Sequence, residues 1–184
     1  MNSVNLHSYR KVYASGAPLR GALWYFINLA FFQTAFPFPV FLKTFLLRLF
    51  GASVGKRTVL KPRISIKYPW LLKLGHDVWV GEKVWIDNLA EVNIGDNVCI
   101  SQGAYLMTGN HNYKKSSFDL IIAPVSVEDG AWVGANAIVC PGITLASHSV
   151  ITAGSVVTKN TLPFTIYQGN PAQPVRTRSI ERND

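Results

Sequence analysis

The sequence predicts an all-β solenoid, and three observations support that prediction. An aliphatic residue recurs at every sixth position through most of residues 54–157, with two short slips and one long interruption. The residue four places after each aliphatic is often small, and none of the aliphatic positions holds a charge. A period of six fits neither an amphipathic helix nor a half-buried strand, whereas short fixed periods are typical of stacked repeats that share one core.

The repeat positions define the predicted coils. All fifteen are Val, Ile or Leu, although these types fill only 48 of the 184 positions in the chain. Three six-residue sides make a triangular coil of about eighteen residues, and each side points one large aliphatic inward. In several repeats a glycine follows the aliphatic, where a tight corner would tolerate it best. The fifteen positions are Val54, Leu60, Ile66, Leu74, Val80, Ile86, Ile94, Ile100, Leu106, Val127, Val133, Val139, Leu145, Ile151 and Val157, and the glycines are Gly55, Gly75, Gly81, Gly95 and Gly134.

Residues 1–50 precede the repeats and have a different character. Residues 21–50 are strongly apolar without a six-residue rhythm, and Pro37 and Pro39 divide them. We therefore predict helices over roughly 20–34 and 38–50. Neither reaches the roughly 20 apolar residues that span a bilayer, and the apolar stretch begins too late for a signal peptide. The segment either caps the open end of the solenoid or dips its aromatic side chains into a membrane surface, and the two roles are compatible.

Charge is unevenly distributed. Residues 1–76 contain eleven Lys and Arg and no Asp or Glu, whereas the remainder has seven basic and ten acidic residues. Such asymmetry indicates an anionic partner, and without a recognisable nucleic-acid module we expect no nucleic acid. The prediction is a cytoplasmic protein that contacts an anionic membrane surface peripherally, at its inner face, through residues 1–76. Cys99 and Cys140 lack ligand-type spacing, so we expect reduced packing residues.

One long interruption separates two blocks of repeats. Between Leu106 and Val127 the rhythm stops, which predicts a protruding loop over 107–126 on a solenoid over 51–160, followed by a C-terminal tail over 161–184. Long excursions from a rigid scaffold often carry function. This loop contains His111, the candidate catalytic residue, although a lone loop histidine can equally be structural. The other histidines lie in the N-terminal tail or at coil corners, where solvation is the simplest interpretation: His7, His76 and His148.

Four motifs in order complete the pattern: WIDN, SQGAYLMTGNH, WVGA and GNPA. Over nearly the whole chain they resemble the hexapeptide-repeat acyltransferases, closest to the colanic-acid and capsular-polysaccharide sugar O-acetyltransferases. The resemblance implies a left-handed parallel β-helix, acetyl-CoA as acyl donor, no metal, and a role in exopolysaccharide biosynthesis. It also implies a sugar acceptor, either free or linked to a lipid or nucleotide, and a homotrimer with active sites between chains.

The resemblance also implies roles for individual residues. His111 matches the general base, and Asp87 and Asn88 match polar positions that face the acceptor. A base is chemically reasonable, because a sugar hydroxyl is too weakly acidic to attack a thioester at neutral pH and imidazole has a suitable pKa. One departure is Gln173, where a basic residue is common after the GNPA turn. The implied CoA-binding residues are Ala135, Ala153, Thr158, Lys159 and Arg176.

Three other functions use the same scaffold. The first is N-acylation of an amino sugar or another small acceptor, which the loop histidine fits equally well. The second is a non-catalytic glycan-binding solenoid, which would be indifferent to substitution of His111. The third is a zinc hydratase, which needs about three converging histidines, and the spacing of the histidines here argues against it.

Overall fold

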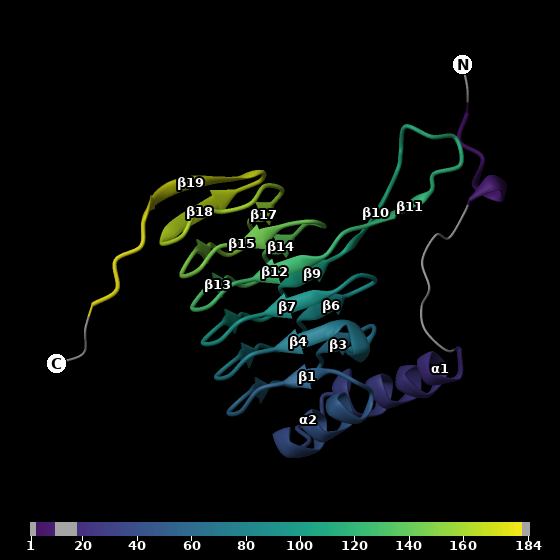
Figure 1. Ribbon diagram of the computed structural model, residues 1–184, viewed down its shortest axis with the longest axis horizontal. Helices are drawn as coiled ribbons and strands as arrows, with labels where there is room; N and C mark the ends of the chain where they lie inside the picture. The colour runs from purple at the N-terminus through teal and green to yellow at the C-terminus, as the bar shows by residue number, and fades with distance from the viewer. Residues whose placement is uncertain (1–2, 10–17, 182–184) are drawn as a thin grey trace.

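The computed structural model describes residues 3–9 and 18–181, and it is a triangular parallel β-solenoid with helices packed across one end (Figure 1). Each coil contributes one short strand to each of three sheets, which we call sheets A, B and C. Sheet A contains β1 (Ser53–Val54), β4 (Leu72–Leu74), β7 (Val92–Ile94), β12 (Val125–Val127) and β15 (Thr144–Leu145). Sheet B contains β2 (Val59–Leu60), β5 (Trp79–Val80), β8 (Cys99–Ile100), β13 (Trp132–Val133), β16 (Val150–Ile151), β18 (Thr165–Gly169) and β19 (Ala172–Thr177). Sheet C contains β3 (Ser65–Ile66), β6 (Trp85–Asp87), β9 (Tyr105–Met107), β14 (Ile138–Val139) and β17 (Val156–Val157).

The six-residue period corresponds to one side of the triangle, as the sequence predicts. All fifteen repeat aliphatics are buried, none more than 8% exposed. Successive coils align them in register, so that in sheet B Val80 lies beside Ile100 and Ile100 beside Val133. Each coil therefore covers the apolar interior of the next, and the stack forms one continuous hydrophobic core.

The glycines after the repeat aliphatics have a different cause from the one expected. None of the five adopts a positive φ; the left-handed corners are instead taken mostly by polar residues such as Arg57, Asp77 and Asn97. At these positions the next coil lies so close that it leaves no room for a side chain. A Cβ on Gly81 would lie 2.6 Å from the backbone nitrogen of Gln102 in the next coil. Close stacking of coils, and not corner geometry, therefore requires glycine there.

The N-terminal helices cover the first coil, at the lower end of the solenoid in Figure 1. The predicted helix over 20–34 is divided into an α-helix and a π-helical turn, and their inward side chains Trp24 and Phe32 join the buried cluster of the coils. The Trp24 indole donates a hydrogen bond to the Ile66 carbonyl, 2.7 Å away. Among the described residues, no helix combines the length and the apolar character needed to cross a bilayer. The helical elements are a 3-10 turn (Leu6–Ser8), α1 (Pro18–Ile27), the π-helical turn (Asn28–Phe32), α2 (Val40–Leu49) and a second 3-10 turn (Pro69–Leu71).

The opposite end is closed by a hairpin. The region expected as a C-terminal tail contains β18 and β19, which pair antiparallel, and β18 continues sheet B by pairing in parallel with β16. Tyr167 on β18 is buried in the common core. The hairpin thus extends sheet B beyond the last coil, and Tyr167 covers that end of the core.

Candidate functional site

The predicted loop is an antiparallel hairpin that projects from the solenoid, which we call the finger. It consists of β10 (Gly109–His111) and β11 (Leu120–Ile122), with His111 paired to Leu120 (Figure 1). The finger leaves the body after β9 of sheet C and returns into β12 of sheet A. The N-terminal segment contacts the finger, where the Asn5 amide donates a hydrogen bond to the Ser116 carbonyl at 2.8 Å.

The finger fixes both the plane and the tautomer of His111. The imidazole stacks on Phe118, with ring centroids 4.4 Å apart and an angle of 7° between the planes. Its Nδ1 lies 3.0 Å from the Phe118 carbonyl oxygen. A carbonyl can only accept, so Nδ1 must carry the hydrogen, and the lone pair of the neutral ring is left on Nε2. The half-buried ring is therefore oriented as a proton acceptor at Nε2.

His111 opens onto a hollow of about 380 Å³, which we call the His111 hollow. This volume falls within the range of small-molecule sites, about 300–1,000 Å³. One wall is the finger, one is the outer face of sheet C, and one is the N-terminal segment through Tyr9, whose ring centroid lies 5.8 Å from that of His111. The lining residues are Tyr9, Lys67, Asp87, Leu89, Tyr105, Gly109, His111 and Leu120.

Asp87 lies at the polar centre of this hollow. It accepts from the Lys67 ammonium at 2.9 Å and from the Tyr105 hydroxyl at 3.3 Å. Burial, followed by the negative charge of Asp87 and the hydrogen bond to it, raises the pKa of Tyr105 to about 12. The phenol thus keeps its proton and donates to the carboxylate. Tyr105 is also held by Trp85, whose ring stacks on it at 4.6 Å.

Asn88, the second residue predicted to face the acceptor, is fully buried. Its side-chain oxygen accepts from the Tyr68 amide at 3.0 Å, and its side-chain nitrogen donates to the Tyr68 carbonyl at 2.6 Å. Both halves of the amide are used on one neighbouring backbone. Asn88 therefore fixes the position of Tyr68, and only Asp87 reaches the His111 hollow.

Two of the predicted cofactor residues share a second depression. Ala135 and Ala153 line a groove of about 410 Å³ at the corner between sheets B and C, beside Trp132 and Gly134. We call it the Ala135 groove. The Trp132 indole donates to Ser101 at 2.9 Å, which fixes one wall. The groove and the His111 hollow have no lining residue in common.

The other predicted cofactor residues lie outside that groove. Thr158 and Lys159 follow β17 and are exposed. Arg176 is exposed on β19, opposite Ile166 of β18. Within the chain, the structure does not bring these three side chains together with Ala135 and Ala153.

The remaining candidates have structural environments. Burial raises the pKa of both the Cys99 and the Cys140 thiol, which favours the neutral form of each. His76 accepts a hydrogen bond from the Lys56 amide at 3.0 Å at an exposed corner. His148, expected to be solvated, is instead half-buried and stacks on Phe164 with centroids 4.5 Å apart. In the part of the chain that the structure describes, no three His, Cys, Asp or Glu side chains gather as metal ligands would.

Sequence reasoning missed Lys67 and Tyr105, which contact Asp87. The repeat could have predicted both contacts, because residues one coil apart lie side by side in a sheet. Asp87 pairs with Met107 on β9, and Tyr105 is two residues before that on the same face. Tyr9 and Phe118, which flank His111, carry no periodic signal because both lie outside the repeats.

Comparison with known proteins gives one family match and a relative along almost the whole chain. Residues 124–159 match the family described as the hexapeptide repeat of succinyl-transferase. A protein of Escherichia coli (strain K12) is 34% identical over 97% of this chain and 98% of its own length. Its name assigns it provisionally to colanic acid biosynthesis as the acetyltransferase WcaF.

Solved structures show the same fold. A maltose O-acetyltransferase from Clostridium difficile 630 superposes with a TM-score of 0.81 at 25% identity, over 91% of this chain and 92% of that one. A hexapeptide-repeat acetyltransferase from Vibrio cholerae O1 biovar eltor, solved with acetyl-coenzyme A, has a TM-score of 0.79 at 22% identity, and the match covers 88% of each chain.

Proposed function

Because the chain belongs to the hexapeptide-repeat acyltransferases, we propose that it transfers an acetyl group to a sugar hydroxyl with His111 as general base. As a member of that family it is an acetyl-CoA-dependent acyltransferase. The observation that carries the proposal is the His111 imidazole, whose Nδ1 is held by the Phe118 carbonyl so that Nε2 is the proton acceptor, and which lines the same hollow as Asp87.

The reaction needs one proton acceptor and no covalent enzyme intermediate. Nε2 of His111 removes the proton of the acceptor hydroxyl as its oxygen attacks the thioester carbonyl carbon of acetyl-CoA. The tetrahedral intermediate collapses, the carbon–sulfur bond breaks, and the imidazolium returns the proton to the leaving thiolate. The products are the acetyl ester and CoA with a free thiol. A base in this position contributes about 10²–10⁴-fold to the rate.

The acceptor is held on the polar side of the His111 hollow. Asp87 accepts hydrogen bonds from sugar hydroxyls there, and its Lys67 and Tyr105 partners fix the carboxylate. Asn88 acts indirectly by holding the Tyr68 backbone. The proposed setting is exopolysaccharide, capsule or colanic-acid-type assembly, which the name of the E. coli relative supports.

The acyl donor lies along the Ala135 groove in this proposal. Small side chains at Ala135 and Ala153 leave room for the pantetheine arm close to the backbone. Thr158, Lys159 and Arg176 are exposed further along the same end of the solenoid, where the two cations are available to the phosphates of CoA.

We also propose a homotrimer, because the hollow and the groove are separate on one chain and a neighbour would bring them together. The outer faces of the sheets support this. Sheet A points polar side chains outward, whereas sheet B points mostly apolar ones, and an apolar flank is what a neighbouring chain covers. The outward residues are Ser53, Lys73, Asn93, Ser126 and Thr144 in sheet A, and Val59, Trp79, Cys99, Trp132, Val150 and Ile166 in sheet B.

Sedimentation equilibrium tests the trimer. The wild-type protein is expected at three times the 20.4 kDa mass of the chain. Trp79→Glu places a charge on the apolar flank and is expected to give monomers, while Lys73→Glu on the polar face leaves the mass unchanged. A wild-type monomer at micromolar concentration contradicts this part of the proposal.

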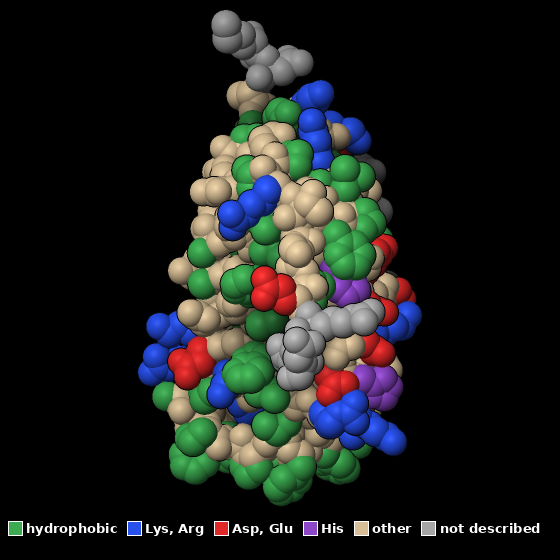
Figure 2. Space-filling view, turned by 90° about the vertical axis from the view of Figure 1, so that its left-hand side faces the viewer, with side chains coloured by type: hydrophobic (Ala, Val, Ile, Leu, Met, Phe, Trp, Pro, Cys, Tyr) green, Lys and Arg blue, Asp and Glu red, His purple; other side chains and the backbone are tan. Residues whose placement is uncertain are grey.

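Peripheral contact with an anionic membrane is proposed for the helical end. Figure 2 shows apolar side chains gathered over that end, with Lys and Arg on both sides of it. The first coil, which packs on α2, contains the basic residues Lys56, Arg57, Lys61 and Arg63. A basic residue near anionic lipid is worth about 1 kcal/mol. The enzyme would then be cytoplasmic and held at the inner face of the membrane. The exposed apolar residues outside the pockets are Leu19, Leu23, Phe26, Leu29, Phe36, Phe41, Phe45 and Leu49.

Flotation with vesicles tests that contact. The wild-type protein is expected to float with phosphatidylglycerol-containing vesicles at low salt and not with pure phosphatidylcholine. Replacing Phe26 and Phe41 by Ser should abolish flotation. Replacing Leu162 and Val175 by Ser should not abolish it, because these two apolar side chains are also exposed but lie near the other end. Equal flotation of both double variants rules out the helical face as the contact.

Thiol release from acetyl-CoA across a panel of sugars and amino sugars tests the reaction. Wild type is expected to form an acetyl ester, and His111→Ala is expected to lose about 10²–10⁴-fold in kcat. His148→Ala, which removes a half-buried stacked histidine outside both depressions, is the matched control. An amide product with an amino sugar and no ester with any sugar would favour the N-acyltransferase alternative. A fully active His111→Ala enzyme would contradict the proposed base.

A further inference from the structure

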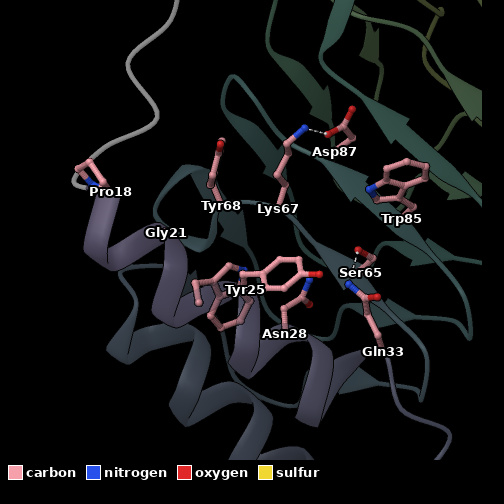
Figure 3. A pocket seen from close by; sticks show the side chains of 11 residues that line it. Pro18, Gly21, Tyr25, Asn28, Gln33, Ser65, Lys67, Tyr68, Trp85 and Asp87 are labelled. Carbon is pink, nitrogen blue, oxygen red and sulfur yellow. Dashed lines mark hydrogen bonds and ion pairs between the residues drawn. The ribbon is translucent and has the colours of Figure 1, made fainter.

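A third depression lies between α1 and the outer face of sheet C, next to the His111 hollow (Figure 3). Its volume is about 350 Å³, and we call it the α1 cleft. Tyr25 of α1 and Gln33 form one side, while Ser65, Tyr68 and Trp85 of the solenoid form the other. Apart from Lys67, Tyr68 and Asp87, its lining residues have no role in the proposed acetyl transfer.

The α1 cleft continues the His111 hollow. Lys67 and Asp87 line both spaces, and their 2.9 Å ion pair forms the boundary between them. Figure 3 shows this pair at the upper edge of the cleft. A ligand whose reacting group lies beside His111 and Asp87 can therefore extend past Lys67 into the cleft.

The walls of the cleft combine aromatic faces with amide and hydroxyl groups. Trp85 is 47% exposed and Tyr25 is 61% exposed, so both rings offer surface to a ligand. The side-chain amide of Gln33 donates to the Ser65 hydroxyl at 3.3 Å, which leaves the Gln33 oxygen available as an acceptor. Pyranose rings present apolar C–H faces and hydroxyl edges, and a mainly apolar site with a few polar groups matches them.

The charge of the cleft selects among ligands. Among the described residues, its charged lining side chains are Lys67 and Asp87, which are paired with each other and cancel. A phosphate or diphosphate group would need an excess of cations at this place. The cleft therefore fits a neutral group, although the surrounding segment is basic.

The cleft is held open by contacts on both sides. The Trp24 indole ties α1 to the Ile66 carbonyl of β3, and Asn88 clamps the Tyr68 backbone with two hydrogen bonds. Tyr68 in turn stacks on Trp70, with centroids 4.9 Å apart. Because these contacts hold the walls in place without a ligand, binding costs little free energy for ordering them.

We propose that the α1 cleft is a subsite for a neutral sugar residue adjacent to the one that is acetylated. The acceptor is then an oligosaccharide, or the glycan part of a larger conjugate, and not a free monosaccharide. This inference rests on the proposed function, since it takes His111 as the place of reaction. It adds that acceptor length is recognised by Tyr25 and Trp85.

Acceptor-length dependence tests the proposal. The probes are glucose, galactose and mannose with their disaccharides and trisaccharides, and UDP-glucose as a charged comparison. Wild type is expected to show higher kcat/KM for a trisaccharide than for its monosaccharide. Tyr25→Ala is expected to reduce that ratio about tenfold, the size of loss typical of a buried aromatic contact. Tyr113→Ala, which removes an exposed tyrosine of the finger outside both spaces, should leave the ratio unchanged.

Binding of the same sugars to His111→Ala, measured by ligand-observed NMR, separates this inference from the proposed reaction. Tyr25-dependent binding of an oligosaccharide would persist even if His111 proved not to be the base. The inference is overturned if no oligosaccharide of the panel shows Tyr25-dependent binding. It is also overturned if Tyr25→Ala lowers kcat/KM equally for all lengths, or if UDP-glucose is the ligand whose binding depends on Tyr25.

Discussion

Replacing Gly81 by alanine isolates the stacking of coils as a stabilising force. Gly81 follows β5 and donates its amide to the Ile100 carbonyl of the next coil at 2.8 Å. A Cβ there would lie 2.6 Å from the Gln102 nitrogen and 2.8 Å from the Ser101 carbonyl carbon, both of them backbone atoms. Because its φ is not in the left-handed region, alanine has no conformational strain of its own at this position. The whole cost comes from pushing two coils apart.

The expected magnitude is that of overpacking a core, about 1–3 kcal/mol. A chain of this size changes its Tm by about 2–4 °C per kcal/mol, so Gly81→Ala should lower Tm by about 2–12 °C. Gly21→Ala in α1 is the control, since nothing lies within 4 Å of its added Cβ. Alanine is a better helix former by about 0.5–1 kcal/mol, which should raise Tm by about 1–4 °C.

Thermal unfolding followed by circular dichroism at one chain concentration measures both variants. Opposite signs for the two substitutions are expected. If Gly81→Ala unfolds at or above the wild-type temperature, the close approach of successive coils does not explain glycine at this position.

Further predictions concern the side chains around the site. Tyr105→Phe removes a donor to a carboxylate, and kcat/KM for the acceptor should fall by about threefold to tenfold. Because the pKa of Tyr105 is raised to about 12, the phenol stays protonated below that value. The ratio of wild type to Tyr105→Phe should therefore be flat between about pH 6 and 10, and a ratio that changes across that range would contradict the protonated donor. Burial raises the pKa of both the Cys99 and the Cys140 thiol. Iodoacetamide at about pH 8 should alkylate them at least roughly tenfold more slowly in the folded protein than in urea, and equal rates would count against burial of the thiols.

The solenoid was predictable from sequence because its period is short and its inward positions are uniform. The slips before Leu74 and Ile94 lie mainly in the turns between strands, and the interruption after Leu106 projects from the solenoid as the finger. Neither disturbs the register of the buried residues. The glycines that follow the repeat aliphatics were expected at tight corners, but they are required by the close approach of the next coil. Whether a residue needs positive φ or needs empty space depends on the neighbouring coil, which a single repeat does not reveal.

The site was predictable only in part. His111 was identified because it lies in the segment that interrupts the repeat. Asp87 was identified because it lies in the WIDN motif, which resembles that of the family. The fixed tautomer of His111 depends on the Phe118 carbonyl, a contact across a hairpin that no periodic pattern encodes. Asn88 shows the reverse limitation. It directly follows the last residue of β6, yet its side chain is buried and bonds the Tyr68 backbone instead of facing the His111 hollow.

Co-expression of two inactive variants would show where the reacting groups meet. His111→Ala lacks the base, and Ala153→Trp fills the Ala135 groove, so each homo-oligomer is expected to be inactive. In randomly mixed trimers, about a quarter of the sites would combine an intact finger from one chain with an intact groove from its neighbour. Recovery of about a quarter of wild-type acetyl transfer is therefore expected. Mixed oligomers that stay inactive at every ratio, or single variants that retain activity, would contradict a site built from His111 of one chain and the groove of the next.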